Sequence, residues 1–253
     1  MPGVPAVTDS AQAAWEAARA RLVYALDYPT LEAARTGATL VRDAIGTLKV
    51  GLELFVHAGP AAVRLGRELG CDVFLDLKLH DIPATVEGAV GNAVALGARY
   101  LTVHASGGTA MLRAATARAA GTGLDIVAVT VLTSLDAADL AAQGLASKPA
   151  EHALRMARLA WLGGVRTFVC SPNEAQALRS ELGAEARLIT PGIRPAGTEA
   201  QDQKRVTTPA QAIANGADLL VIGRPIRDAA DPLGMARRIV DQIAEAAAGQ
   251  ASR

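Results

Sequence analysis

Short apolar runs alternate with longer stretches of helical periodicity along almost the whole of this chain. Each run holds three to six mainly aliphatic or β-branched residues, which is typical of strands buried on both faces of a parallel sheet. The runs predict eight strands, at residues 22–26, 48–50, 73–77, 100–104, 126–131, 167–170, 188–190 and 219–222.

The stretches between these runs are rich in alanine and leucine at helical spacing. They predict eight helices, at residues 31–44, 61–69, 84–96, 110–120, 150–161, 174–182, 209–215 and 232–247. Gly70, Gly97 and Gly216 follow three of them, as expected where a helix ends in a left-handed residue.

Eight alternating strands and helices predict an α/β fold, the (β/α)8 or TIM barrel. With 253 residues, 51% of them hydrophobic, the chain can bury one large core. We expect a catalytic barrel domain at residues 21–250, preceded by a short helical extension at residues 1–20. A doubly wound sheet is the structural alternative, but no Gly-x-Gly-x-x-Gly follows the first strand.

Composition and charge argue against two classes of partner. The 25 basic and 25 acidic residues balance, and only 3% of residues are aromatic, so no nucleic-acid partner is expected. No apolar run approaches the ~20 residues of a membrane helix, and the first twenty residues do not resemble a signal peptide. Cys71 and Cys170 lie far apart and predict free thiols in the cytoplasm rather than a metal site.

The most informative segment is residues 76–85, which read Asp-Leu-Lys-Leu-His-Asp-Ile-Pro-Ala-Thr. Side chains alternate along a strand, so Asp76 and Lys78 should point into one site, and Asp81 follows where the chain turns toward a helix. A buried ion cluster costs much desolvation energy, which favours a chemical role. The alternative is a structural salt-bridge network at the rim of the barrel.

Polar side chains also recur at the ends of the other predicted strands. Active sites of such barrels lie at the carboxyl ends of the strands, where these residues would meet. The residues concerned are Asp27, Lys49, Asp76, Lys78, His104, Thr133, Ser134, Arg194 and Arg224. Charge at strand after strand predicts a polar, anion-binding pocket, in which we expect His104 and the neighbouring His80 to be structural.

The last two strands offer a candidate phosphate site. Gly192 and Gly223 would let the backbone approach a ligand, and Arg224 offers two parallel donors to phosphate oxygens. Residues 194–207 form a long polar loop that could close over the ligand, and Gln203 within it could bridge phosphate and a carbonyl. Alternatively, the glycines serve turns and Arg224 is solvated.

With these residues assembled, the chain resembles the orotidine 5′-phosphate decarboxylase family, in its bacterial, single-function form. The resemblance runs over nearly the whole chain, and the extension alone lies outside it. The matching segments are residues 25–27, 49–51, 76–85, 130–134, 190–195, 202–203 and 221–226. The resemblance implies decarboxylation of orotidine 5′-phosphate to UMP in pyrimidine biosynthesis, with no cofactor and no metal.

The resemblance also implies roles for individual residues. Lys78 would protonate C6 after CO2 leaves, Asp76 would lie against the substrate carboxylate, and Asp27 and Lys49 would bind the ribose. The catalytic set is Lys49, Asp76, Lys78 and Asp81. Residues at the phosphate end are Arg194, Gln203, Gly223 and Arg224.

Two further implications concern the base and the assembly. Thr133 would contact the pyrimidine edge, with Ser134 the alternative. Asp81 and Thr85 would reach the ribose bound to the other subunit of a homodimer with shared active sites.

Two other functions stay open at this point. A magnesium-dependent sugar-phosphate lyase or decarboxylase of the same barrel superfamily would share the Asp-x-Lys-x-x-Asp core but lack the Ile-Pro-x-Thr continuation seen here. A catalytically silent nucleotide-binding or scaffold protein on this barrel would tolerate loss of the charged residues that this chain retains. A magnesium requirement would identify the first, and inactivity on orotidine 5′-phosphate the second.

Overall fold

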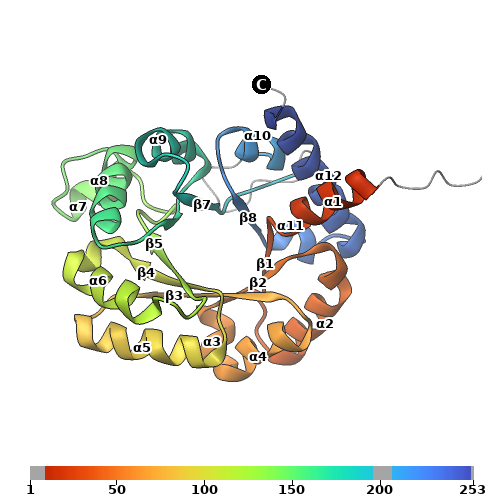
Figure 1. Cartoon of the computed structure of the whole chain (residues 1–253), viewed down its shortest axis with the longest axis horizontal. Helices are drawn as coiled ribbons and strands as arrows, with labels where there is room; N and C mark the ends of the chain where they lie inside the picture. Colours follow the sequence, from red (N-terminus) through yellow and green to blue (C-terminus); the bar gives the residue numbers. More distant parts are fainter. Residues whose placement is uncertain (1–8, 196–206, 252–253) are drawn as a thin grey trace, which may run out of the picture.

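The computed structural model describes residues 9–195 and 207–251. In this part of the chain eight parallel strands pair in sequence order, and β1 also pairs with β8, so the sheet closes into a barrel (Figure 1). The strands are β1 (Leu22–Ala25), β2 (Thr47–Gly51), β3 (Asp72–Leu79), β4 (Tyr100–His104), β5 (Asp125–Val129), β6 (Thr167–Val169), β7 (Arg187–Thr190) and β8 (Leu219–Ile222). The predicted (β/α)8 barrel is confirmed.

Helices surround the barrel as an outer ring (Figure 1). Their bounds are α1 (Asp9–Arg19), α2 (Leu31–Val41), α3 (Leu52–Ala58), α4 (Pro60–Glu68), α5 (Pro83–Leu96), α6 (Gly108–Ala119), α7 (Ala137–Ala142), α8 (Pro149–Leu162), α9 (Pro172–Leu182), α10 (Pro209–Ala214), α11 (Arg224–Arg227) and α12 (Pro232–Ala251). Helices α3, α7 and α11 were not expected from the sequence, because four to seven residues are too few to show a helical period.

The local sequence explains where several of these helices begin. Proline occupies the first turn of α4, α5, α8, α9 and α10, where its missing N–H costs no helical hydrogen bond. Helix α9 also has a capping box, in which the backbone N–H of Ser171 donates to the Glu174 carboxylate at 2.9 Å. The fixed starts of α5 and α9 also fix the short loops that follow β3 and β6.

Two apolar layers hold the barrel together. Inward-facing strand residues fill its interior, where the rings of Phe74 and Tyr100 meet edge to face at 5.8 Å. The other members of this inner cluster are Val23, Val127, Ile189 and Leu219. A larger cluster lies between the strands and the surrounding helices.

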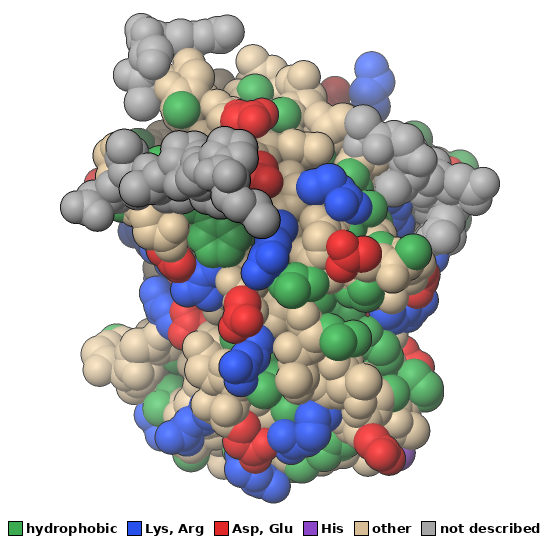
Figure 2. Space-filling view, turned by 90° about the vertical axis from the view of Figure 1, so that its right-hand side faces the viewer, with side chains coloured by type: hydrophobic (Ala, Val, Ile, Leu, Met, Phe, Trp, Pro, Cys, Tyr) green, Lys and Arg blue, Asp and Glu red, His purple; other side chains and the backbone are tan. Residues whose placement is uncertain are grey.

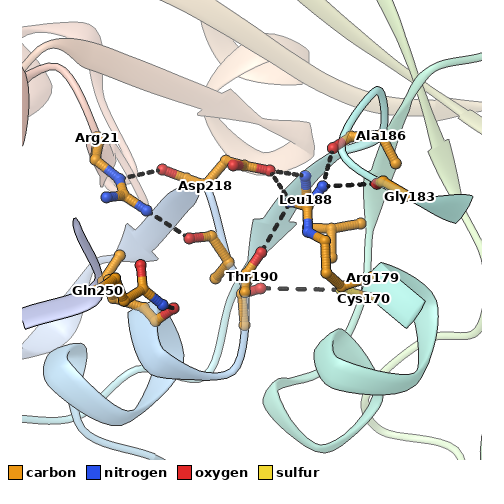
Figure 3. Close-up of polar contacts among 12 residues, drawn as sticks. Arg21, Cys170, Arg179, Gly183, Ala186, Leu188, Thr190, Asp218 and Gln250 are labelled. Carbon is orange, nitrogen blue, oxygen red and sulfur yellow. Dashed lines mark hydrogen bonds and ion pairs between the residues drawn. The ribbon is translucent and has the colours of Figure 1, made fainter. Parts of the chain in front are cut away.

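A polar network ties together the amino ends of β1, β7 and β8 (Figure 3). The Asp218 carboxylate accepts hydrogen bonds from Arg179 of α9 at 2.6 Å and from the Leu188 N–H at 2.7 Å. Arg21 donates to the carbonyls of Asp218 and Ala217 at 2.8 and 2.7 Å. These contacts satisfy loop carbonyls at the end of the barrel away from the carboxyl ends of the strands, which is the end that serves stability in this fold.

Helix α1 belongs to the expected N-terminal extension and lies beside α12 (Figure 1). Trp15 donates to the Asp241 carboxylate at 3.1 Å, and Arg19 donates to the Ile45 carbonyl at 2.7 Å. The domain boundaries at residues 1–20 and 21–250 stay a prediction.

The surface carries charges of both signs. Figure 2 shows basic and acidic side chains interspersed with apolar ones over one face of the molecule. Among the described residues, no helix is both long enough and apolar enough to span a bilayer.

Candidate active site

A cavity of about 240 Å³ lies at the carboxyl ends of the strands. Strands and loops from around the barrel contribute to its wall. It is lined by Ala25, Asp27, Lys49, Phe74, Asp76, Lys78, Val129, Val131, Leu132, Thr133, Val169, Pro191, Gly192, Arg194, Val221, Gly223 and Arg224.

Eight of the eleven site residues expected from the sequence line this cavity, namely Asp27, Lys49, Asp76, Lys78, Thr133, Arg194, Gly223 and Arg224. Asp81 and Thr85 are exposed and do not line it. Gln203 lies outside the described residues. The alternative to Thr133, Ser134, is exposed and is not part of the lining.

A charged chain of four side chains runs along one wall of the cavity. Lys78 Nζ lies 2.8 Å from Asp76 Oδ1, and Lys49 Nζ lies 3.5 Å from Asp76 Oδ2. Lys49 Nζ also lies 3.4 Å from Asp27 Oδ1. Asp76 is the shared partner of both lysines, and its side chain is only 14% exposed, so solvent screens its two contacts weakly, whereas the Asp27 side chain is 50% exposed.

The ionisation of Asp76 reflects two opposing effects. Burial disfavours its charged form, but the ammonium groups of Lys49 and Lys78 outweigh that penalty and hold the pKa of the carboxyl below its ordinary value. Hydrogen bonds from Lys78 and Thr102 act in the same direction. Asp76 is therefore a carboxylate at neutral pH, and it keeps the two ammonium groups close together.

The backbone at Lys78 departs from regular strand geometry. Its φ is +52°, the only positive φ at a non-glycine residue in the described parts of the chain. The pairing of β3 with β4 also shifts register between Leu75 and Leu79. Asp76 and Lys78 do meet, as the sequence led us to expect, but the simple alternation behind that expectation is interrupted.

Sequence reasoning missed Thr102, a fully buried residue of β4. Its hydroxyl accepts the Lys78 N–H at 2.8 Å and donates to Asp76 Oδ1 at 3.0 Å. A threonine inside a strand is ordinary in sequence, so only the register between neighbouring strands reveals this contact.

Residues that directly follow β7 and β8 form another part of the lining. Gly192 adopts a φ of +81°, which favours glycine. At Gly223, an added Cβ would lie 3.2 Å from the Ala25 Cβ, so a side chain would crowd the cavity wall. Arg194 is 8% exposed, and Arg224 is half-buried. The backbone N–H of Arg194 donates to the Thr207 carbonyl at 2.9 Å.

Apolar side chains form the rest of the lining and were also missed from sequence. They are Phe74, Val129, Val131, Leu132, Val169 and Val221. In sequence they are indistinguishable from core residues, because their strands continue directly from the apolar interior of the barrel. Apolar side chains beside a charged chain suit a ring-shaped ligand with polar groups at its edges.

The segment that follows Lys78 turns away from the cavity and is exposed. The Asp81 carboxylate accepts the Ile82 N–H at 2.6 Å, and the Ile82 side chain is 66% exposed. Leu52 and Val56 of α3 are 53% and 82% exposed. These three exposed apolar side chains lie outside the cavity lining.

Comparison with protein families agrees with this geometry. The model described as the "Orotidine 5'-phosphate decarboxylase / HUMPS family" matches residues 20–239. The chain belongs to this family. The match begins at residue 20, directly after the end of α1 at Arg19.

Individual members of the orotidine 5′-phosphate decarboxylase family are similar over most of their length. A protein of that name from Anaeromyxobacter dehalogenans is 56% identical over 219 residues, covering 87% of this chain and 96% of the relative. One from Frankia casuarinae is 46% identical, covering 92% and 90%. The crystal structure of orotidine 5′-phosphate decarboxylase from Lactobacillus acidophilus superimposes with a TM-score of 0.77 at 33% identity, covering 88% and 98%.

In this family member, His104 makes stability depend on pH. Burial disfavours the imidazolium, and His80 and Lys78 add repulsion, so the pKa of His104 lies below its ordinary value. The unfolded chain therefore takes up a proton near pH 6.5, before the folded state does. The His104 contribution to stability is complete above pH 6.5 and is lost as the pH falls through the folded pKa.

We therefore expect the free energy of unfolding to decrease as the pH is lowered from about 6.5. The decrease should be smaller in His104→Gln. Urea denaturation from pH 7.5 to 5 measures both, and NMR titration of the imidazoles assigns the pKa. His57→Gln is the matched control, since His57 lies on α3, away from the cavity lining. A His104 pKa at or above 6.5 would contradict this account.

Proposed function

We propose that this protein decarboxylates orotidine 5′-phosphate to UMP and CO2. The observation that carries the proposal is the Lys49–Asp76–Lys78 chain of charges in a cavity that also contains Arg194 and Arg224. The family match and the relatives named for this reaction support it.

The charge of the cavity suits this substrate. Four cationic side chains and two carboxylates line it, a formal charge of +2 over the described residues. Lys78 lies on β3 and Arg194 follows β7, four strands away in the ring of eight. A ligand with a carboxylate at one end and a phosphate at the other matches this separation.

Lys78 supplies the chemistry. Breaking the bond between C6 and its carboxylate releases CO2 and leaves the electron pair on C6, where no carbonyl is placed to delocalise it as an enolate. The Lys78 ammonium stabilises this carbanion and donates a proton to C6, giving UMP and a neutral amine that regains its proton from solvent. Opposite unit charges about 4 Å apart attract by ~4 kcal/mol at an effective dielectric of about 20.

Asp76 and Lys49 prepare that ammonium. Asp76 accepts from Lys78 at 2.8 Å and holds it at the site, and Lys49 balances the charge on the other carboxylate oxygen. Because these groups are fixed before the substrate arrives, little reorganisation is needed during the reaction.

The remaining predicted site residues bind the substrate. Asp27 and Lys49 bind the ribose hydroxyls, and Thr133 contacts the edge of the base. Residues of the phosphate end are Arg194, Gln203, Gly223 and Arg224. The arginines supply charge-assisted hydrogen bonds, and the small Gly223 leaves room for the phosphate oxygens.

The active unit in this proposal is a homodimer with shared active sites. Asp81 and Thr85 are exposed beside the cavity rather than in its lining, so they are available to a ribose bound by the partner subunit. The exposed Ile82, Leu52 and Val56 supply apolar area for such a contact. The free, buried thiols of Cys71 and Cys170 fit the reducing cytoplasm.

A direct assay tests the function. Purified protein should convert orotidine 5′-phosphate to UMP in the presence of EDTA and without added cofactor, because the proposed carbanion is stabilised by Lys78 itself. Loss of absorbance on decarboxylation and chromatographic detection of UMP measure the reaction. Lys78→Ala protein prepared in parallel controls for a contaminating enzyme.

The outcome separates the alternatives. Activity that EDTA abolishes and Mg²⁺ restores would indicate the sugar-phosphate lyase branch instead. Binding of UMP without turnover would indicate a silent nucleotide-binding protein.

A further inference from the structure

Thr102 connects the two central residues of the proposed site. It lies in the middle of β4 and is fully buried. Its single hydroxyl proton is donated to Asp76 Oδ1 at 3.0 Å, and its oxygen accepts the Lys78 backbone N–H at 2.8 Å. One side chain therefore contacts the carboxylate of one residue and the backbone of the other.

The backbone that Thr102 binds is irregular. The β3–β4 register runs from Leu75 opposite Leu101 to Leu79 opposite Val103, so four steps along β3 match two along β4. Lys78 lies inside this interval, with a φ of +52° that non-glycine residues rarely adopt. Such a conformation persists only where surrounding contacts hold it, and the hydroxyl of Thr102 is a contact at that position.

The same hydroxyl orients the carboxylate. Asp76 Oδ1 accepts from both the Thr102 hydroxyl and Lys78 Nζ, so the two donors approach one oxygen from β4 and β3. The backbone conformation of Lys78 sets the direction of its side chain, and the Asp76 oxygen sets where the ammonium ends. Thr102 contacts both the Lys78 backbone and the Asp76 carboxylate but does not line the cavity.

We propose that Thr102 is a positioning residue that fixes the irregular backbone at Lys78 and thereby places the Lys78 ammonium against Asp76. The effect on turnover rests on the proposed function, whereas the effect on geometry does not. Loss of the hydroxyl should impair the chemical step and leave binding at the phosphate end intact.

Thr102→Val tests this inference, because valine keeps the shape of threonine and removes both hydrogen bonds. We expect kcat per UMP-binding site to fall about 10- to 100-fold, the scale of a misplaced catalytic group, with KM and UMP affinity little changed. Thr102→Ser keeps the hydroxyl and should restore most of kcat. Thr167→Val is the matched control, since Thr167 is a buried strand residue at the opposite end of the barrel.

Counting sites by UMP titration separates a slow enzyme from a partly unfolded one. If Thr102→Val does not fold, Thr102→Cys replaces the hydroxyl with a weak hydrogen-bonding thiol of similar size and takes its place. Unchanged kcat per site in the variant that folds, or an equal loss in Thr167→Val, would overturn the inference.

Crystal structures of the Thr102 variants provide a readout that does not depend on the substrate. In Thr102→Val, or in Thr102→Cys, Lys78 should leave the positive-φ region and Nζ should move away from Asp76, while Thr102→Ser should retain both features. A variant without the hydroxyl that keeps the geometry would refute the positioning role. Absence of turnover in the wild-type protein would instead refute the proposed function and leave the structural comparison decisive.

Discussion

Lys78→Ala should abolish turnover of orotidine 5′-phosphate, with kcat reduced by at least about 10⁴-fold. That figure is the upper range for loss of a general acid, and the same ammonium also stabilises the carbanion in this proposal. Affinity for UMP should survive, because Arg194 and Arg224 line the cavity after β7 and β8, four and three strands away from Lys78 on β3. Steady-state kinetics and UMP calorimetry measure the two effects separately.

Two further variants sharpen that experiment. Lys78→Arg keeps the positive charge, but guanidinium does not release its proton, so it should also be nearly inactive if proton donation matters. Arg224→Ala should mainly raise KM through lost phosphate contacts. Substantial kcat in Lys78→Ala would show that another group delivers the proton.

Mixing two inactive proteins should restore activity if the sites are shared. In a heterodimer of Lys78→Ala and Asp81→Ala subunits, two-fold symmetry puts both lesions in one site and neither in the other. Up to about half of the wild-type activity per heterodimer should therefore return. The exposure of Asp81 outside the cavity is the structural motive for this experiment.

The measurement needs proof that subunits exchange. Differently tagged variants, refolded together and purified through both tags, supply heterodimers of known composition. A mixture of Lys78→Ala with Lys78→Arg is the control, because every site in it lacks the lysine. Heterodimers no more active than their parents would place Asp81 in the site of its own subunit.

The barrel could be predicted from sequence because its signal is repeated. The eight apolar runs correspond to the eight described strands within a few residues, the largest differences being β3, which continues to Leu79, and β5, which ends at Val129. Polar residues at strand ends were likewise visible, because the fold brings those ends together. The short helices and the apolar lining residues were not, since neither leaves a distinctive pattern in sequence.

The pairing register between neighbouring strands could not be predicted from the sequence. The expectation that Asp76 and Lys78 meet assumed regular alternation, whereas the contact depends on a shifted pairing with β4 and on the Thr102 hydroxyl. Pairing between strands far apart in the chain is set by the whole barrel. A residue such as Thr102 therefore becomes visible only in three dimensions.

The left-handed backbone at Lys78 lowers protein stability, whereas the lysine at this position is needed for the proposed activity. Such a conformation costs a non-glycine residue about 1–3 kcal/mol, a notable share of the roughly 5–15 kcal/mol that stabilises a typical domain. Glycine adopts this φ freely, so Lys78→Gly would relieve the backbone cost, but it would also remove one ammonium partner of the buried Asp76 carboxylate. Stability-guided redesign of this barrel should therefore hold Lys78 fixed, because relieving the backbone cost there would also remove the proposed proton donor.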